Sequence, residues 1–155
     1  QLENIVENVD VLFMDEKEII SFTSKSTIFA AAQAVRDMGP RIVLVKRGEY
    51  GVVMFNEGDI FYVPAFPVEN VVDPTGAGDS FAGGFMGYLS STNDFSPGSL
   101  RRATVVASVM GSFAVEGFST ERVGKLTNPE IEDRFRGIAG MTYFEPLQNK
   151  EELFN

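Results

Sequence analysis

The sequence predicts an α/β fold, in which helices cover a mostly parallel sheet that carries one antiparallel hairpin. Segments with strand and helix patterns alternate along the 155 residues, as in layered α/β proteins. Residues 42–45 form a continuous apolar run of the kind found in a parallel strand that is buried on both faces. A glycine-rich turn at residues 73–79 separates an apolar extended run from a helix. No repeat or linker interrupts the pattern, so we expect residues 1–155 to form a single domain.

The first elements are a strand, a helix and a second strand. Residues 9–14 have the pattern of a short buried strand, which runs into the acidic segment 15–18. Residues 24–38 are rich in alanine and predict a helix, which Gly39 and Pro40 end. The second strand is the apolar run described above.

A hairpin is expected next, formed by residues 52–55 and 60–63 with turn-forming residues 56–59 between them. Pro64 and Pro67 then break the chain into short extended pieces that lead to the glycine-rich turn.

Three helices complete the predicted fold. The helix after the glycine-rich turn carries Phe81, Phe85 and Leu89 at four-residue spacing, which gives it one apolar face. Ser96 followed by proline predicts the start of the next helix, and Thr127 to Glu130 has the spacing of a capping box that starts the last. The polar tail from Gln148 is expected to be loosely packed.

Composition excludes several classes of function. Thirteen basic and twenty-two acidic residues give a net charge of −9, which opposes binding to nucleic acid or to an anionic membrane. We find neither a long apolar run for a membrane span nor a signal peptide. The absence of cysteine makes a cytoplasmic protein the default, and the absence of histidine excludes nucleophile–histidine triads.

The glycine-rich turn is the strongest functional signal. The N–H groups of Gly76, Ala77, Gly78 and Asp79 are placed to form an anion hole at the positive end of the following helix. Asp79 is then a carboxylate beside a bound phosphate, which suits a base. The alternative is a plain glycine turn that Asp79 caps. A dinucleotide fingerprint is excluded because Phe81 replaces its third glycine.

Residues 73–85 closely resemble the C-terminal signature of the ribokinase-like, or PfkB, family of carbohydrate and nucleoside kinases. The resemblance extends upstream through residues 45–52 and 15–18, and is loosest after Gly117. It implies a three-layer α/β/α ribokinase-like fold, of which this chain supplies the C-terminal half. The half that carries most sugar-binding residues and a lid is then absent. ATP, Mg²⁺ and a sugar or nucleoside substrate are the partners that the resemblance implies.

The resemblance also assigns roles to residues. Asp79 matches the family's catalytic aspartate, and Lys46, Gly48 and Gly51 stand where the family contacts the nucleotide phosphates. For Lys46, a solvated surface lysine is the alternative. Phe118 is a candidate wall of the base pocket, or equally an apolar anchor of its loop.

Two metal sites are implied in the same way. Asp15 and Glu18 occupy the place of a motif whose glutamate organises magnesium and its waters, although Asp15 replaces the family's asparagine. Asp73 and Thr75 are candidates for a monovalent-cation site such as a K⁺ site. The alternatives are a solvated acidic helix start for the first pair and hydrogen bonds within a turn for the second.

Phosphoryl transfer from ATP to a hydroxyl group of a sugar, sugar derivative or nucleoside is therefore the leading hypothesis, with Asp79 as general base. A non-catalytic domain that binds a nucleotide or anion is the second hypothesis. An assembly module that is inactive without its N-terminal half is the third. Pairing with that half or a homodimer is expected, whereas the sequence does not identify the acceptor.

Overall fold

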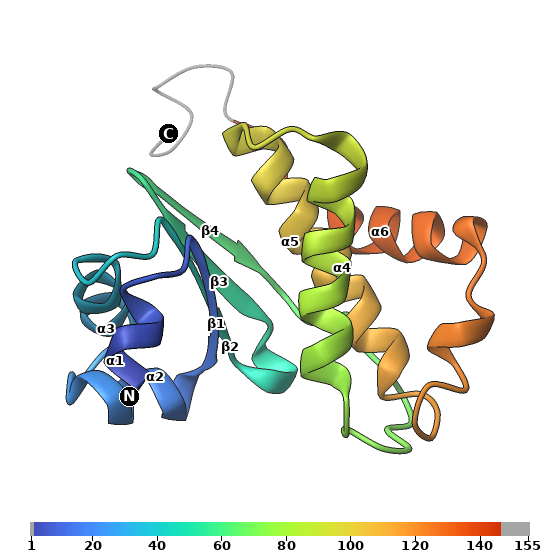
Figure 1. The fold of residues 1–155 in the computed structure, drawn as a ribbon. Coiled ribbons are helices and arrows are strands. Elements are labelled where there is room, and N and C mark those ends of the chain that lie inside the picture. The colour runs from blue at the N-terminus through green and yellow to red at the C-terminus, as the bar shows by residue number, and fades with distance from the viewer. Residues whose placement is uncertain (1, 147–155) are drawn as a thin grey trace, which may run out of the picture.

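The computed structural model describes residues 2–146, which fold into three layers (Figure 1). A four-stranded sheet is the middle layer. Helices α1, α2 and α3 lie on one face, while α4 and α5 cover the other face and α6 packs beside α5. In chain order the elements are α1 (Leu2–Val6), β1 (Val11–Asp15), α2 (Glu16–Thr23), α3 (Ile28–Arg36), β2 (Ile42–Lys46), the 3₁₀ turn η1 (Gly48–Tyr50), β3 (Val52–Asn56), β4 (Asp59–Val63), α4 (Ala77–Thr92), α5 (Pro97–Ala114), η2 (Val123–Lys125) and α6 (Asn128–Thr142).

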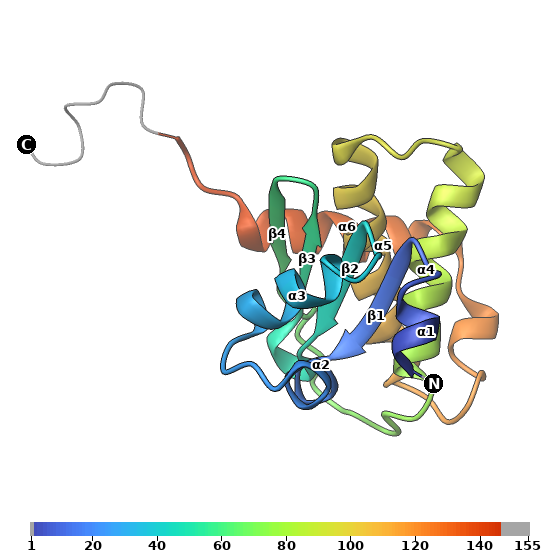
Figure 2. The same cartoon turned by 60° about the vertical axis from the view of Figure 1, so that its left-hand side comes forward.

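The sheet has the strand order β1-β2-β3-β4, which Figure 2 shows from the side of α3. Strands β1 and β2 are parallel, and their last residues, Asp15 and Lys46, lie opposite each other. The pairs β2–β3 and β3–β4 are antiparallel. The α/β class is as predicted, but among the strands described the sheet is mixed rather than mostly parallel. The short connection through η1 leaves no room for a crossover, so β3 must return antiparallel to β2.

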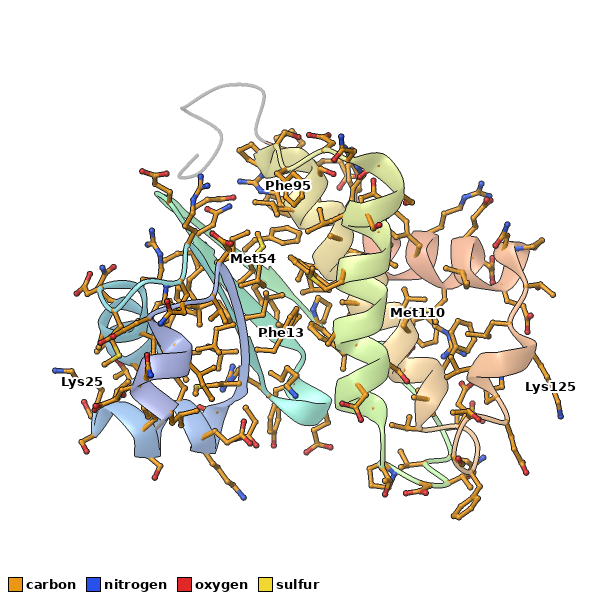
Figure 3. All side chains as sticks on the ribbon, viewed as in Figure 1. Phe13, Lys25, Met54, Phe95, Met110 and Lys125 are labelled. Carbon is orange, nitrogen blue, oxygen red and sulfur yellow. The ribbon has the colours of Figure 1, made fainter. Side chains whose placement is uncertain are left out.

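Alternate side chains of the strands pack into two separate hydrophobic cores, one on each face of the sheet. On β2, Val43 and Val45 pack with α2 and α3, whereas Leu44 packs with α4 and α5. Phe13 on β1 makes edge-on contacts with Phe81 and Phe85 of α4, with ring centroids 6.1 and 5.5 Å apart. In Figure 3 the labelled side chains of Phe13 and Met54 lie between the sheet and the helices α4 and α5. Burial on both faces explains why β2 is a continuous apolar run.

Several predicted boundaries are confirmed. The hairpin forms with residues 57 and 58 at its turn, and α5 begins at Pro97, where the Ser96 hydroxyl accepts a hydrogen bond from the Ser99 N–H. Helix α6 begins after Thr127, whose N–H donates to the Glu130 carboxylate at 2.9 Å. That contact is the carboxylate half of the predicted capping box.

Other predictions of local structure were wrong. The helix predicted at residues 24–38 begins later than expected, because Ser24 ends α2 in the left-handed conformation (φ 53°) and Thr27 caps the helix that forms, α3. Helix α1 was not predicted. The segment before the glycine turn was expected to consist of short extended pieces, and no strand forms there; Val72 donates its N–H to the Val115 carbonyl at 2.8 Å and ties this loop to the end of α5.

Within residues 2–146, none of the helices combines the length and the apolar character needed to cross a bilayer. The polar tail from Gln148 lies outside the described residues.

Candidate functional site

A cleft of about 720 Å³ opens at the carboxyl ends of the parallel strands β1 and β2. Asp15 and Lys46, the last residues of these strands, line it together with Ala77 and Gly78 at the start of α4. The carboxyl ends of parallel strands are where open α/β sheets usually bind ligands. The structure thus gathers residues from three separate predicted motifs in one cleft.

The glycine-rich turn presents unused N–H groups toward this region. Gly76 is the N-cap of α4 in the left-handed conformation (φ 78°), and no side chain caps the helix. The Ala77 N–H makes only a long contact of 3.3 Å with the Pro74 carbonyl. The N–H groups of Gly78 and Asp79 belong to the first helical turn, where no intrahelical acceptor exists. An anion bound here would supply the missing acceptors.

Lys46 brings a positive charge to the same place. If Gly78 carried a Cβ atom, that atom would lie 2.9 Å from the Lys46 Nζ. The amine therefore lies beside the start of α4, and among residues 2–146 it forms no ion pair with a carboxylate. The neighbouring Arg47 is different, because it is paired with Glu16 at 2.9 Å. Lys46 is thus available to a ligand.

Gly48 and Gly51, to which the family resemblance assigned phosphate contacts, lie in the same cleft. Both line the cleft and both have positive φ, 56° and 89°. A side chain at Gly51 would collide with the carbonyl oxygen of Val63, whereas the space around Gly48 is open. Gly51 is therefore required by the close approach of β4.

Asp79 lies one position beyond the cleft lining, on the exposed side of the first turn of α4. Its carboxylate does not cap the helix, and Asp79 is exposed to solvent. Gly76 is likewise beside the cleft rather than in its wall.

Asp15 and Glu18 form a reciprocal capping box at the start of α2. The Glu18 N–H donates to Asp15 Oδ1 and the Asp15 N–H donates to Glu18 Oε2, both at 2.7 Å. Each carboxylate keeps one oxygen outside the box, and only Asp15 lines the cleft. This arrangement fits an indirect contact with hydrated Mg²⁺, which retains waters and often takes few protein ligands.

Asp73 and Thr75 make the turn-stabilising contact that was the alternative to a cation site. The Thr75 N–H donates to Asp73 Oδ1 at 2.9 Å, and this hydrogen bond lowers the pKa of the Asp73 carboxyl. Neither residue lines the cleft. Residues 2–146 contain no cluster of three or more carboxylates able to hold a metal ion by themselves.

Part of the cleft lining is largely apolar. This apolar wall includes Phe66, Val71, Ser112 and Val115. Phe118, the predicted wall, is 66% exposed and does not line the cleft. Spacing gave a partial signal for this wall, since residues 108, 111 and 112 are small and share one face of α5.

Comparison with known proteins gives a consistent result. The chain matches the pfkB family of carbohydrate kinases over residues 1–122. It is 40% identical over 90 residues to a cytidine kinase of Thermococcus kodakarensis, an alignment that covers 56% of this chain and 32% of that protein. It is 36% identical over 122 residues to a nucleoside kinase of Methanothermobacter thermautotrophicus, covering 78% of this chain and 36% of that protein. The chain thus spans about a third of the length of these curated relatives.

A solved structure shares the fold as well. The crystal structure named as a ribokinase II of E. coli, in complex with ATP and Mg²⁺, has a TM-score of 0.73 and 29% sequence identity to this chain. The superposition covers 88% of this chain and 42% of that one.

Proposed function

Because this chain belongs to the pfkB family of carbohydrate kinases, we propose that it forms the nucleotide-binding and catalytic part of an enzyme that transfers a phosphoryl group from ATP to a hydroxyl group. A nucleoside is the favoured acceptor, since a cytidine kinase and a nucleoside kinase are among its relatives, and a sugar or sugar derivative is the alternative. One observation carries the proposal: the unpaired amine of Lys46 shares a cleft with the uncapped start of α4.

Phosphate binding follows from this geometry. The N–H groups of Gly76, Ala77, Gly78 and Asp79 form the anion hole, and the dipole of α4 favours negative charge at the same point. Lys46, Gly48 and Gly51, which line the same cleft, also hold the phosphates. These groups are in place before the reaction, so they stabilise the charge that spreads over the transferred phosphoryl oxygens.

The carboxylate of Asp79 accepts the proton of the acceptor hydroxyl group. As this proton leaves, the acceptor oxygen forms a bond to the γ-phosphorus of ATP. The bond between the γ-phosphorus and the β,γ-bridging oxygen breaks, and ADP is the leaving group. Bound Mg²⁺ would neutralise charge on the β- and γ-phosphates. Asp15 and Glu18 would hold its waters through the carboxylate oxygens that the capping box does not use. Asp73 and Thr75 remain the proposed K⁺ ligands, and Phe118 remains a proposed base contact that needs its loop to move.

The relatives are about twice as long as this chain, so we place the acceptor site in residues that lie beyond it. Pairing with an N-terminal half and formation of a homodimer stay predictions, as does a cytoplasmic location.

The replacement Asp79→Asn in the full-length protein tests the proposed base. We expect turnover to fall about 10²- to 10⁴-fold, while the affinity for ATP with Mg²⁺ is kept because the anion hole is unchanged. Asp133→Asn is the matched control, since Asp133 is exposed on α6 away from the cleft and should leave turnover unaltered. Steady-state kinetics with a panel of nucleosides and sugars, and calorimetry of ATP binding, measure both quantities.

Unchanged turnover in Asp79→Asn would remove Asp79 as the base. ATP binding by the full-length protein without transfer to any acceptor of the panel would favour the second candidate, a non-catalytic nucleotide-binding domain.

A further inference from the structure

Helix α6 contributes a largely covered arginine that contacts residues of the cleft wall. The side chain of Arg134 is only 12% exposed. Its Nη1 donates to the Ser112 hydroxyl at 3.0 Å, and its Nη2 donates to Glu116 Oε1 at 2.7 Å. The guanidinium also stacks on two rings, 3.5 Å from the centroid of Phe113 and 4.5 Å from that of Phe66. One side chain therefore joins four others.

Two of these four partners line the cleft. Phe66 and Ser112 belong to the apolar wall of the cleft. Val115, which precedes Glu116, also lines the cleft. The residues that Arg134 holds thus lie on the loop before the glycine turn and at the end of α5, which are far apart in sequence. A planar guanidinium is suited to this task because it stacks and donates at the same time.

Helix α6 approaches Phe66 from a second position. A Cβ atom on Gly137 would lie 3.0 Å from the edge of the Phe66 ring. Gly137 is three residues after Arg134 and so lies on the same face of the helix. The ring is therefore held by the guanidinium over its face and by the backbone of α6 at its edge.

Glu116 connects the wall to the start of α6. Its second oxygen, Oε2, lies 3.5 Å from Arg122 Nε, and Arg122 Nη2 donates to Glu130 at 2.8 Å. Arg122 also stacks on Phe113, with 4.8 Å to the ring centroid. The two arginines together fix the loop that follows α5, and a buried charge in such a network is costly to leave unpaired.

We propose that Arg134 is a positioning residue that fixes the apolar wall against which the nucleotide base packs, and that it sets affinity for the base rather than for the phosphates. This inference rests on the proposed function. It follows from the cleft residues that Arg134 contacts: Phe66 and Ser112 line the cleft, and neither is among the proposed phosphate-binding residues Lys46, Gly48 and Gly78. The family match stops at residue 122, so α6 is outside it.

Two ligands distinguish contacts to the nucleotide base from contacts to the phosphates. In the full-length protein, calorimetry with ATP and Mg²⁺ measures an affinity to which both kinds of contact contribute, whereas tripolyphosphate and Mg²⁺ measure the phosphate contacts alone. We expect Arg134→Ala to weaken ATP binding about tenfold, as misplaced positioning groups do, and to leave the affinity for tripolyphosphate unchanged. Arg134→Lys keeps the charge but loses the planar stack, so it should fall between Arg134→Ala and the unaltered protein.

Arg136→Ala is the matched control on the same helix. The side chain of Arg136 is 79% exposed and pairs only with Glu132 at 3.5 Å, so its removal should leave both affinities unchanged. If Arg134→Ala fails to fold, Gly137→Ala and Glu116→Gln test the same wall. Gly137→Ala pushes the Phe66 ring, and Glu116→Gln removes one charge partner of Arg134. Each should weaken ATP binding and spare tripolyphosphate.

The outcomes are distinct. Equal losses for both ligands, or no loss for either, would overturn the positioning role of Arg134 while leaving the kinase proposal standing. If the unaltered protein binds neither ligand, the proposed function is itself overturned, and this inference is overturned with it. A lower melting temperature with no change in the ratio of the two affinities would show a purely structural arginine.

Discussion

At the scale of single residues, Lys46 connects the sheet to the glycine turn. It ends the parallel strand β2, and its amine reaches the backbone of Gly78 at the start of α4. An ammonium group acts on phosphates as a point charge, so its contribution to phosphate binding falls as the salt concentration rises. Position and lack of a protein partner together give Lys46 its proposed role.

Replacing Lys46 by alanine should weaken binding of ATP with Mg²⁺ by about ten- to a hundredfold, which is the usual effect of losing a hydrogen bond to a charged group. The loss should shrink as salt is added, because added ions screen the lysine. Lys25→Ala is the control, since Lys25 projects from the molecular surface between α2 and α3 (Figure 3). Calorimetry at two salt concentrations measures the effect; equal affinities for Lys46→Ala and the parent would mean a solvated surface lysine.

Residues whose role depends on local backbone were predictable, and residues whose role depends on distant contacts were not. Gly78, which lines the cleft, was named from the glycine-rich turn, whose residues are consecutive, and Gly51 was named from the family resemblance. Arg134 gave no signal, since its partners lie 18 to 68 positions away in sequence. Phe118 was placed by resemblance alone, and the loop turns it outward.

At the scale of elements, α4 and α5 pack unusually closely at Gly84. A Cβ atom there would lie 2.8 Å from Met110 Cγ and 3.2 Å from Ala107 Cα, which is backbone that cannot move aside alone. One turn further along α4, Gly87 has open space around it. The same residue type therefore has two different roles on one helix.

Gly84→Ala should lower the free energy of unfolding by about 1–3 kcal/mol, because it overpacks the contact between the helices. Gly87→Ala should raise it by about 0.5–1 kcal/mol, because alanine is the better helix former where space permits. Urea unfolding of the two variants beside the parent measures both changes. Equal effects of the two replacements would contradict the close approach of α4 and α5.

The start of α6 depends on an ionised carboxylate. Hydrogen bonds from the Thr127 hydroxyl and N–H, followed by one from Arg122, lower the pKa of Glu130 from 4.5 to about 2. A lowered pKa in the folded state means that this contribution to stability is complete above pH 4.5 and is lost as the pH falls through about 2.

Glu130→Gln should therefore lower the melting temperature at neutral pH, and the difference from the parent should close as the pH falls from about 5 to 2. Glu132→Gln is the control on the same helix, because its exposed pairing with Arg136 contributes little at any pH. Thermal unfolding followed by circular dichroism measures both variants. A difference that stays constant over this range would mean that Glu130 does not act through its charge.

Element boundaries followed the capping residues. Ser96 and Thr127 were recognised as helix starts and mark the true ones, whereas Thr27 was overlooked and the predicted helix began too early. Strand direction was harder to predict, because β2 and β3 have similar apolar patterns and only the short connection at η1 sets them antiparallel.

At the scale of the whole molecule, all cleft residues named here lie between positions 15 and 115, while the relatives are about twice as long as the chain. We therefore expect the 155-residue chain to bind ATP with Mg²⁺ but to transfer no phosphoryl group until the rest of the protein is present. Calorimetry and a turnover assay on both lengths measure this. Binding by the longer protein alone would mean that the nucleotide site is completed across two halves, and turnover by the shorter chain would place the acceptor site within it.

The attachment of α6 bears on how the protein should be divided for experiments. The family pattern ends at residue 122, but the folded unit continues to Thr142, because α6 buries Ile138 and encloses Arg134 against α5. A chain that ends at residue 122 would retain every signature residue but would lack α6, so the surface of α5 that α6 covers would be exposed. It would also remove Arg134 from Glu116 and Glu130 from Arg122. Recombinant boundaries for this protein should follow the packing of its helices rather than the extent of its sequence pattern.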